Sequence, residues 1–276
     1  MAGKISMADI THLRKMTGAG MMDCKNALAE AEGDFEKAME VIRKKGQAVA
    51  AKRSDRNASE GCVLAKTTGP YAAMIALKCE TDFVAKNADF VALATEILDL
   101  AIANKCVDVE AVKALPMGKS TVSEAIIDRS GITGEKMELD GYAFVEAPTT
   151  SIYIHPGNKL ATIVAFNQAN VEPQVAHEIA MQIAAMNPIS VDAASVPAEV
   201  LATEKEIAAD KARQEGKPEN MIEKIALGRI NKFYKEVCLL QQEYVKDTKL
   251  TVAQFLDSSS KGLTVTAFKR YTLNAD

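Results

Sequence analysis

The sequence predicts an α+β protein, and three observations point to this fold class. Apolar side chains recur at helical spacing between glycines over the first 56 residues. A strand, a turn, a second strand and a helix then follow one another twice, with turns at 68–70 and 156–158. Two polar helical runs flank Gly216-Lys217-Pro218. We therefore expect an N-terminal three-helix module, a duplicated β-hairpin-plus-helix core and an inserted antiparallel helical hairpin.

Residues 1–56 are expected to form the three-helix module and its linker. Ser6 and Asp9 have the spacing of a capping box at the start of a first helix, which the glycine-bearing turn after it ends. Helical spacing predicts a second helix over 22–31 and a third over 35–45, with Gly46 ending the third. The alanine-rich residues 47–52 that follow could continue as helix. Three helices this short have a thin core of their own.

Two features of this region have alternative interpretations. Met21 and Met22 are adjacent, so they cannot both face one helical core, and one of them is expected to face outward. An outward methionine is either an adaptable contact surface or ordinary packing. The charged cluster Lys52, Arg53 and Arg56 is typical of a solvated linker, with a nucleic-acid contact as the less favoured alternative.

The core is predicted in two halves, at 57–145 and at 146–197 plus 238–276. The first half has strand-like runs at 62–66 and 71–79 and a helix near 88–103. Phe83 lies between strand and helix, where it either packs into its own core or is an exposed anchor for a partner.

The second half repeats this order and then continues past the helical hairpin. Its strands are expected at 151–155 and 160–166, with a helix over 173–186. The hairpin at 198–237 has two helices, which either bury their apolar stripes against each other or offer surplus apolar surface to a partner. Further strands are predicted at 238–245 and 263–273, on either side of a short helix at 251–256.

Composition excludes several functional classes. The chain has 276 residues and a net charge of −4, which does not favour binding to a phosphate backbone. No apolar run reaches the length that crosses a membrane, and the N-terminus has no signal core, so we expect a cytoplasmic protein. Five cysteines without a C-x-x-C pair indicate free thiols. Metalloprotease, P-loop and serine-hydrolase signatures are absent, so we expect no metal, cofactor or catalytic residue.

Four segments carry a resemblance to a known family. Residues 17–28 (TGAGMMDCKNAL) closely resemble the N-terminal motif of the bacterial elongation factor Ts family, and residues 81–86 (TDFVAK) resemble its core motif. Residues 180–188 are similar to the helix in the second half of its core, and 216–218 match the tip of its coiled-coil arm. The motifs occur in the family's order over nearly the whole chain.

The resemblance implies a fold and a function. The N-terminal module would be UBA-like, a ubiquitin-associated-type three-helix domain, and the protein would be a non-catalytic guanine-nucleotide exchange factor for elongation factor Tu in translation elongation. Phe83, with Asp82 beside it and Thr81 and Val84 in the same motif, would insert into the G domain of that GTPase and disturb its magnesium and phosphate site.

Four further contact residues for the GTPase follow from the resemblance. Arg14, Met21 and Met22 match positions where the N-terminal module contacts the same G domain. His155 falls where the second half of the core meets another domain of the partner. Met16 departs from the motif, which commonly has a basic residue there. Some family members also continue into a C-terminal helical module, which we expect this chain to lack.

Other functions stay open at this point. A protein-binding adaptor without exchange activity is the main alternative, because a helical module alone permits it. An enzyme that uses Cys79 or His155 is disfavoured, since no base or orienting group stands at a recognisable spacing. A homodimer of the exchange complex is left open, and neither nucleic acid nor a membrane is expected as a direct partner.

Overall fold

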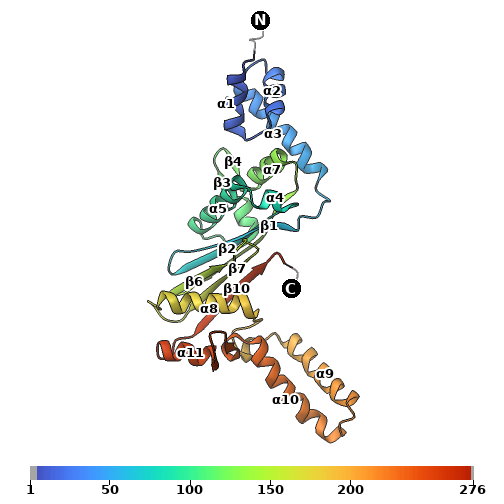
Figure 1. Ribbon diagram of the computed structural model, residues 1–276, viewed down its shortest axis with the longest axis vertical. Coiled ribbons are helices and arrows are strands. Elements are labelled where there is room, and N and C mark those ends of the chain that lie inside the picture. Colours follow the sequence, from blue (N-terminus) through green and yellow to red (C-terminus); the bar gives the residue numbers. More distant parts are fainter. Residues whose placement is uncertain (1–4, 275–276) are drawn as a thin grey trace.

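The protein is elongated, with a helical module at one end and a helical hairpin at the other (Figure 1). The computed structural model describes residues 5–274. The N-terminal module contains α1 (Met7–Thr17), α2 (Met21–Glu30) and α3 (Phe35–Lys52). Two sheets and their covering helices form the middle of the molecule, and α9 (Ala198–Gln214) and α10 (Glu219–Val237) form the hairpin.

The ends of the first helices follow from local side-chain chemistry. Ser6 and Asp9 exchange side-chain and backbone hydrogen bonds, so the predicted capping box is confirmed. Gly18 takes φ +72° after α1, a left-handed conformation that favours glycine. The prediction that Gly46 ends the third helix is wrong, because α3 continues to Lys52. Gly46 is buried, and it allows α3 to approach Gly131 of α7 (Val122–Thr133) closely.

Two three-stranded antiparallel sheets have matching strand orders. The first sheet runs β1-β2-β5, and the second runs β6-β7-β10. In each sheet, the central strand pairs with its hairpin partner on one side and with a strand from later in the chain on the other. The strands are β1 (Glu60–Thr67), β2 (Tyr71–Cys79), β5 (Met137–Glu146), β6 (Thr149–Ile154), β7 (Leu160–Phe166) and β10 (Val265–Thr272).

The core has a helix–sheet–sheet–helix arrangement. Helix α5 (Ala88–Ala103) covers the outer face of the first sheet, and α8 (Pro173–Met186) covers that of the second. The inner faces meet in a cluster rich in alanine, which lets the two sheets pack closely. Shorter elements complete this region: α4 (Asp82–Ala85), α6 (Val109–Lys113), β3 (Pro116–Met117) and β4 (Ser120–Thr121).

The segment after the hairpin differs from its prediction. Residues 238–245 do not form one strand, because the 3₁₀ turn η2 (Leu239–Gln241) precedes the two-residue β8 (Glu243–Tyr244). The fully buried Gln242 explains the turn, since its amide donates to the backbone oxygens of Met186 and Glu236. The remaining elements are η1 (Ala193–Ser195), β9 (Asp247–Thr251) and α11 (Val252–Ser259). Within residues 5–274, no helix is long and apolar enough to cross a membrane.

Candidate partner-binding site

Phe83 projects into solvent from α4, directly after β2. Among residues 5–274 it is the most exposed of the large apolar side chains, at 84%. Its neighbours Val84 and Ala85 are half-buried and pack against the first core cluster, so α4 has an anchored face and a free face. The interpretation that Phe83 packs into its own core is therefore wrong.

Asp82 and Thr81 define the start of this short helix. Thr81 caps α4, because its hydroxyl accepts a hydrogen bond from the Val84 amide at 3.4 Å. Asp82 is half-buried, and its carboxylate accepts from Lys86 Nζ at 2.6 Å. This hydrogen bond and charge hold the pKa of Asp82 below its usual range. The motif thus presents an apolar ring beside an ion pair.

The N-terminal residues of the prediction lie on a different part of the molecule. Arg14 and Met22 are exposed, Met22 at 64%, whereas Met21 is half-buried against the core of the module. The expectation that one of the two methionines faces outward is confirmed. Figure 1 shows α1 and α2 at the end of the molecule, with α4 beside the first sheet. Arg14 and Met22 therefore lie on the N-terminal module, apart from Phe83 on α4.

His155 forms a third separate group, just after β6. The side chain is exposed, and its Nδ1 lies 3.0 Å from the hydroxyl of Tyr153. The Tyr153 ring also meets His177 of α8 edge-on. His155 is thus held against the second half of the core, in the turn between β6 and β7.

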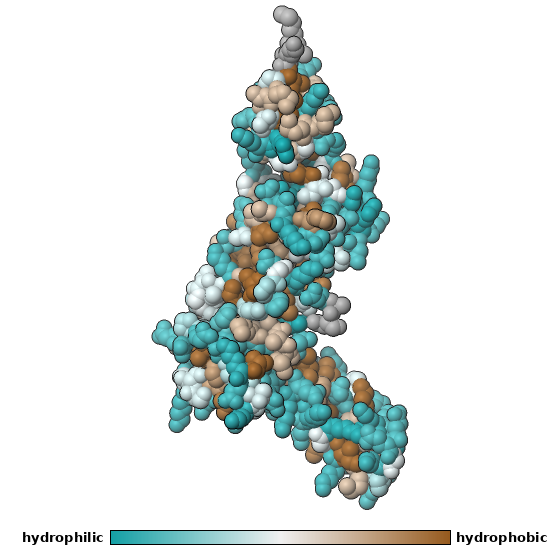
Figure 2. Space-filling view, viewed as in Figure 1, coloured by the Kyte–Doolittle hydropathy of each residue, from teal (hydrophilic) through white to brown (hydrophobic). Residues whose placement is uncertain are grey.

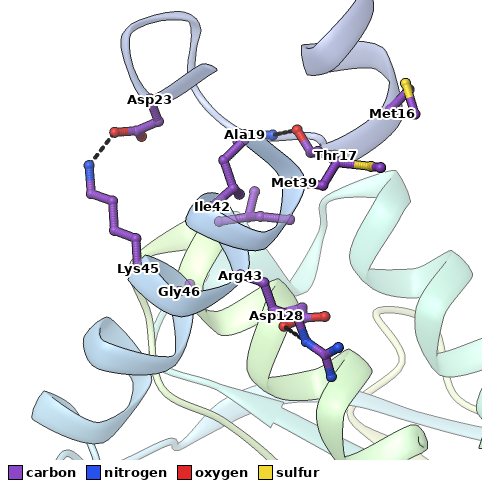
Figure 3. Close-up of a pocket in the computed structure, with 12 residues that line it drawn as sticks. Met16, Thr17, Ala19, Asp23, Met39, Ile42, Arg43, Lys45, Gly46 and Asp128 are labelled. Carbon is purple, nitrogen blue, oxygen red and sulfur yellow. Dashed lines mark hydrogen bonds and ion pairs between the residues drawn. The ribbon is translucent and has the colours of Figure 1, made fainter. Parts of the chain in front are cut away.

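A cavity that the sequence did not indicate lies between the N-terminal module and α7 (Figure 3). Its volume is about 290 Å³, and apolar side chains such as Met39 and Ile42 line it. Arg43 lies 3.6 Å from Asp128 at its edge, and burial raises the pKa of Asp128. Gly46 and Gly131 meet beside it and were the available sequence signal for close packing here.

The linker cations differ from one another: Lys52 and Arg56 are exposed, as expected for a solvated linker, whereas Arg53 is half-buried. Arg53 donates to both carboxylate oxygens of Glu80, at 3.0 and 3.1 Å, and Arg56 lies 3.8 Å from the same group. Glu80 immediately precedes Thr81, so these contacts connect the end of α3 to residues 80–86, which we call the Phe83 turn. Glu80 offsets one of the three positive charges of this cluster.

The helical hairpin combines buried and exposed apolar residues. Ile222 and Ile230 are buried between the two helices, whereas Ile207 and Leu227 are exposed. In the surface view, brown areas appear on the hairpin and along the core within a largely teal surface (Figure 2). The hairpin therefore uses only part of its apolar surface for its own packing.

Residues 5–274 contain no group of three or more side chains that could hold a metal ion. All five cysteines are buried and free. Burial is the main cause that raises the pKa of Cys79 to about 12, so its thiol stays protonated near neutral pH.

Comparison with known proteins agrees with the sequence motifs. The family model "Elongation factor TS" matches residues 80–275. A protein named elongation factor Ts from Porphyromonas gingivalis is 57% identical over 273 residues, covering 99% of both chains. Its namesake from Bacteroides thetaiotaomicron is 53% identical over 329 aligned residues, again covering 99% of both chains. Since the matches extend over almost the whole sequence, the chain belongs to the elongation factor Ts family.

Proposed function

We propose that this protein is a guanine-nucleotide exchange factor for elongation factor Tu and that Phe83 inserts into the G domain of the GTPase. The names of its relatives support the function. The observation that carries the mechanism is the 84% exposure of Phe83 on an otherwise anchored helix. An apolar ring held in solvent is suited to burial in a partner.

Exchange requires a difference in affinity rather than tight binding alone. A factor that binds the nucleotide-free GTPase better than the loaded one weakens nucleotide binding by the same ratio. Burial of a Phe side chain contributes roughly 1.5–3 kcal/mol, and each tenfold in affinity corresponds to about 1.4 kcal/mol. Burial of Phe83 therefore accounts for a weakening of GDP binding by about 10- to 100-fold. In this proposal its insertion disturbs the magnesium and phosphate site.

The other predicted residues supply the remaining contacts. Arg14, Met21 and Met22 bind the G domain from the N-terminal module, and His155 binds a second domain of the GTPase. Asp82, Thr81 and Val84 contribute at the Phe83 turn, although Thr81 and Val84 are half-buried and act chiefly by holding α4 in place. Contacts at separate parts of an elongated molecule match a partner with more than one domain.

The test is release of fluorescent GDP from purified elongation factor Tu. Wild-type protein in catalytic amounts is expected to accelerate release strongly, and Phe83→Ala is expected to reduce this by about 10- to 100-fold. The fold is retained because the removed ring leaves no cavity. Val107→Ala, which truncates an exposed apolar residue in the loop before α6, is the matched control and keeps full activity.

The other outcomes separate function from mechanism. Acceleration that survives Phe83→Ala keeps the exchange function and assigns the mechanism to the N-terminal contacts. Binding to elongation factor Tu without any acceleration supports the protein-binding adaptor instead.

A further inference from the structure

The orientation of Phe83 depends on interactions outside its own helix. Helix α4 contains only four residues, too few to be stable alone. One face of it packs on the core, and its N-terminal end is attached to the end of β2. Whatever fixes the backbone between Cys79 and Asp82 therefore decides where Phe83 points.

Glu135 supplies that fixation from the loop that follows α7. Its carboxylate accepts hydrogen bonds from the backbone amides of Glu80 and Thr81, at 3.2 and 3.0 Å. It also accepts from the Thr81 hydroxyl at 2.6 Å. The Thr81 hydroxyl thus donates to Glu135 and accepts from the Val84 amide, which links Glu135 to the first turn of α4.

Glu80 makes a reciprocal contact with the segment that carries Glu135. Its carboxylate accepts from the Lys136 amide at 2.7 Å, while Arg53 of the α3 terminus donates to the same group. The last residue pair of the β2–β5 ladder is Cys79 with Met137. Residues 80–81 and 135–136 therefore continue this ladder through two carboxylates, an arrangement that we call the carboxylate clamp.

We propose that Glu135 is a positioning residue for Phe83, acting through the carboxylate clamp to hold α4 in the orientation that exchange requires. This inference rests on the proposed function. Glu135 does not itself touch the nucleotide or the GTPase. Through Arg53, the same clamp attaches the Phe83 turn to α3 and so to the N-terminal module. Two of the proposed contact regions are thereby held in a fixed relation to each other.

The test removes the clamp with Glu135→Ala, which leaves the amides of Glu80 and Thr81 without their acceptor. Catalysed GDP release is expected to fall about tenfold, the scale of one hydrogen bond to a charged group. Glu135→Gln retains one acceptor oxygen and is expected to recover part of the loss. Glu146→Ala, which removes a carboxylate that pairs with Lys105 at the other end of β5 and lies outside the clamp, is the control and leaves release unchanged.

A double-mutant cycle with Phe83→Ala separates positioning from general stability. If Glu135 acts through Phe83, Glu135→Ala has almost no further effect on GDP release in the Phe83→Ala background. An equal tenfold loss in both backgrounds would overturn the proposal, because the loss would then be independent of Phe83. Thermal denaturation of each variant verifies that it is folded before its activity is compared.

Amide hydrogen exchange on the free protein gives a readout independent of the GTPase. Glu135→Ala is expected to increase exchange over residues 80–86 and to leave α5 and the sheets protected. Unchanged exchange over 80–86 would overturn the proposal. If wild-type protein does not accelerate GDP release, the proposed exchange function is wrong. Hydrogen exchange over residues 80–86 then decides by itself whether Glu135 orders this segment.

Discussion

The contact between Gly46 of α3 and Gly131 of α7 predicts different effects on stability for the same substitution at the two glycines. A Cβ built on Gly131 would overlap the Cα of Gly46 and lie 2.8 Å from its carbonyl carbon. A Cβ on Gly46 would lie 3.3 Å from the Cα of Gly131, so a small shift accommodates it. Neither glycine is among those with positive φ, so alanine is excluded at Gly131 by packing and not by backbone conformation.

The magnitudes follow from two opposing terms. Replacing glycine by alanine inside a helix contributes about 1 kcal/mol of stability through helix propensity. Overpacking a close contact costs about 1–3 kcal/mol, and here the obstructing atoms are backbone and cannot rotate away. We therefore expect Gly131→Ala to destabilise the protein by up to about 2 kcal/mol and Gly46→Ala to be near neutral. Gly228→Ala, with nothing near its added methyl group, is expected to stabilise α10 by about 1 kcal/mol.

Thermal unfolding followed by circular dichroism measures all three variants under one set of conditions. A change of 1 kcal/mol shifts Tm by about 2–4 °C in a chain of this size class. Tm is expected to be highest for Gly228→Ala, intermediate and equal for wild type and Gly46→Ala, and lowest for Gly131→Ala. A Gly131→Ala variant at least as stable as wild type would refute the close packing of α3 on α7.

Two further predictions concern ionisable groups. Burial opposes ionisation of Glu178, but hydrogen bonds from Lys246, Tyr244 and Gln174 outweigh it and lower its pKa from 4.5 to about 2. The ionised carboxylate of Glu178 therefore stabilises the folded protein fully above pH about 4.5, and this stabilisation is lost as the pH falls toward 2. Glu178→Gln should lower the free energy of unfolding by about 2 kcal/mol near neutral pH and remove this part of the acid dependence of Tm. All five cysteines are buried, and burial raises the pKa of Cys62 and Cys79 to about 12. Because a buried thiol is out of reach of solvent, a thiol reagent at pH 8 should label none of the five before the protein unfolds and all five in denaturant. Rapid labelling of the native protein would contradict their burial.

Local sequence signals predicted those parts of the fold that local chemistry determines. The capping box at Ser6 and Asp9 fixed the start of α1. The predicted bounds of α8, Pro173–Met186, are those of the structure, because proline suits a first helical turn and Asn187 ends the helix in a left-handed conformation. The domain boundaries at 56, 145 and 197 stay predictions.

The predictions failed where the conformation of a residue depends on a contact with a residue far away in the sequence. Gly46 looked like a helix end because glycine weakens an isolated helix, whereas its contact with Gly131 comes from a helix far along the chain. The side chain of Gln242 bends a segment that otherwise reads as a strand. Glu135 lies 54 residues from Thr81 and belongs to no motif, so no local pattern could have assigned it to the Phe83 turn.

The same reasoning bears on why the Phe83 turn is built as it is. Phe83 adds little to the packing of its own protein, since 84% of its side chain is in solvent. Yet Thr81, Val84 and Glu135 all fix the backbone that carries it. A residue selected only for the stability of this chain would not need such support. An anchor for a partner would, because holding the ring in its bound orientation beforehand reduces the entropy lost on binding.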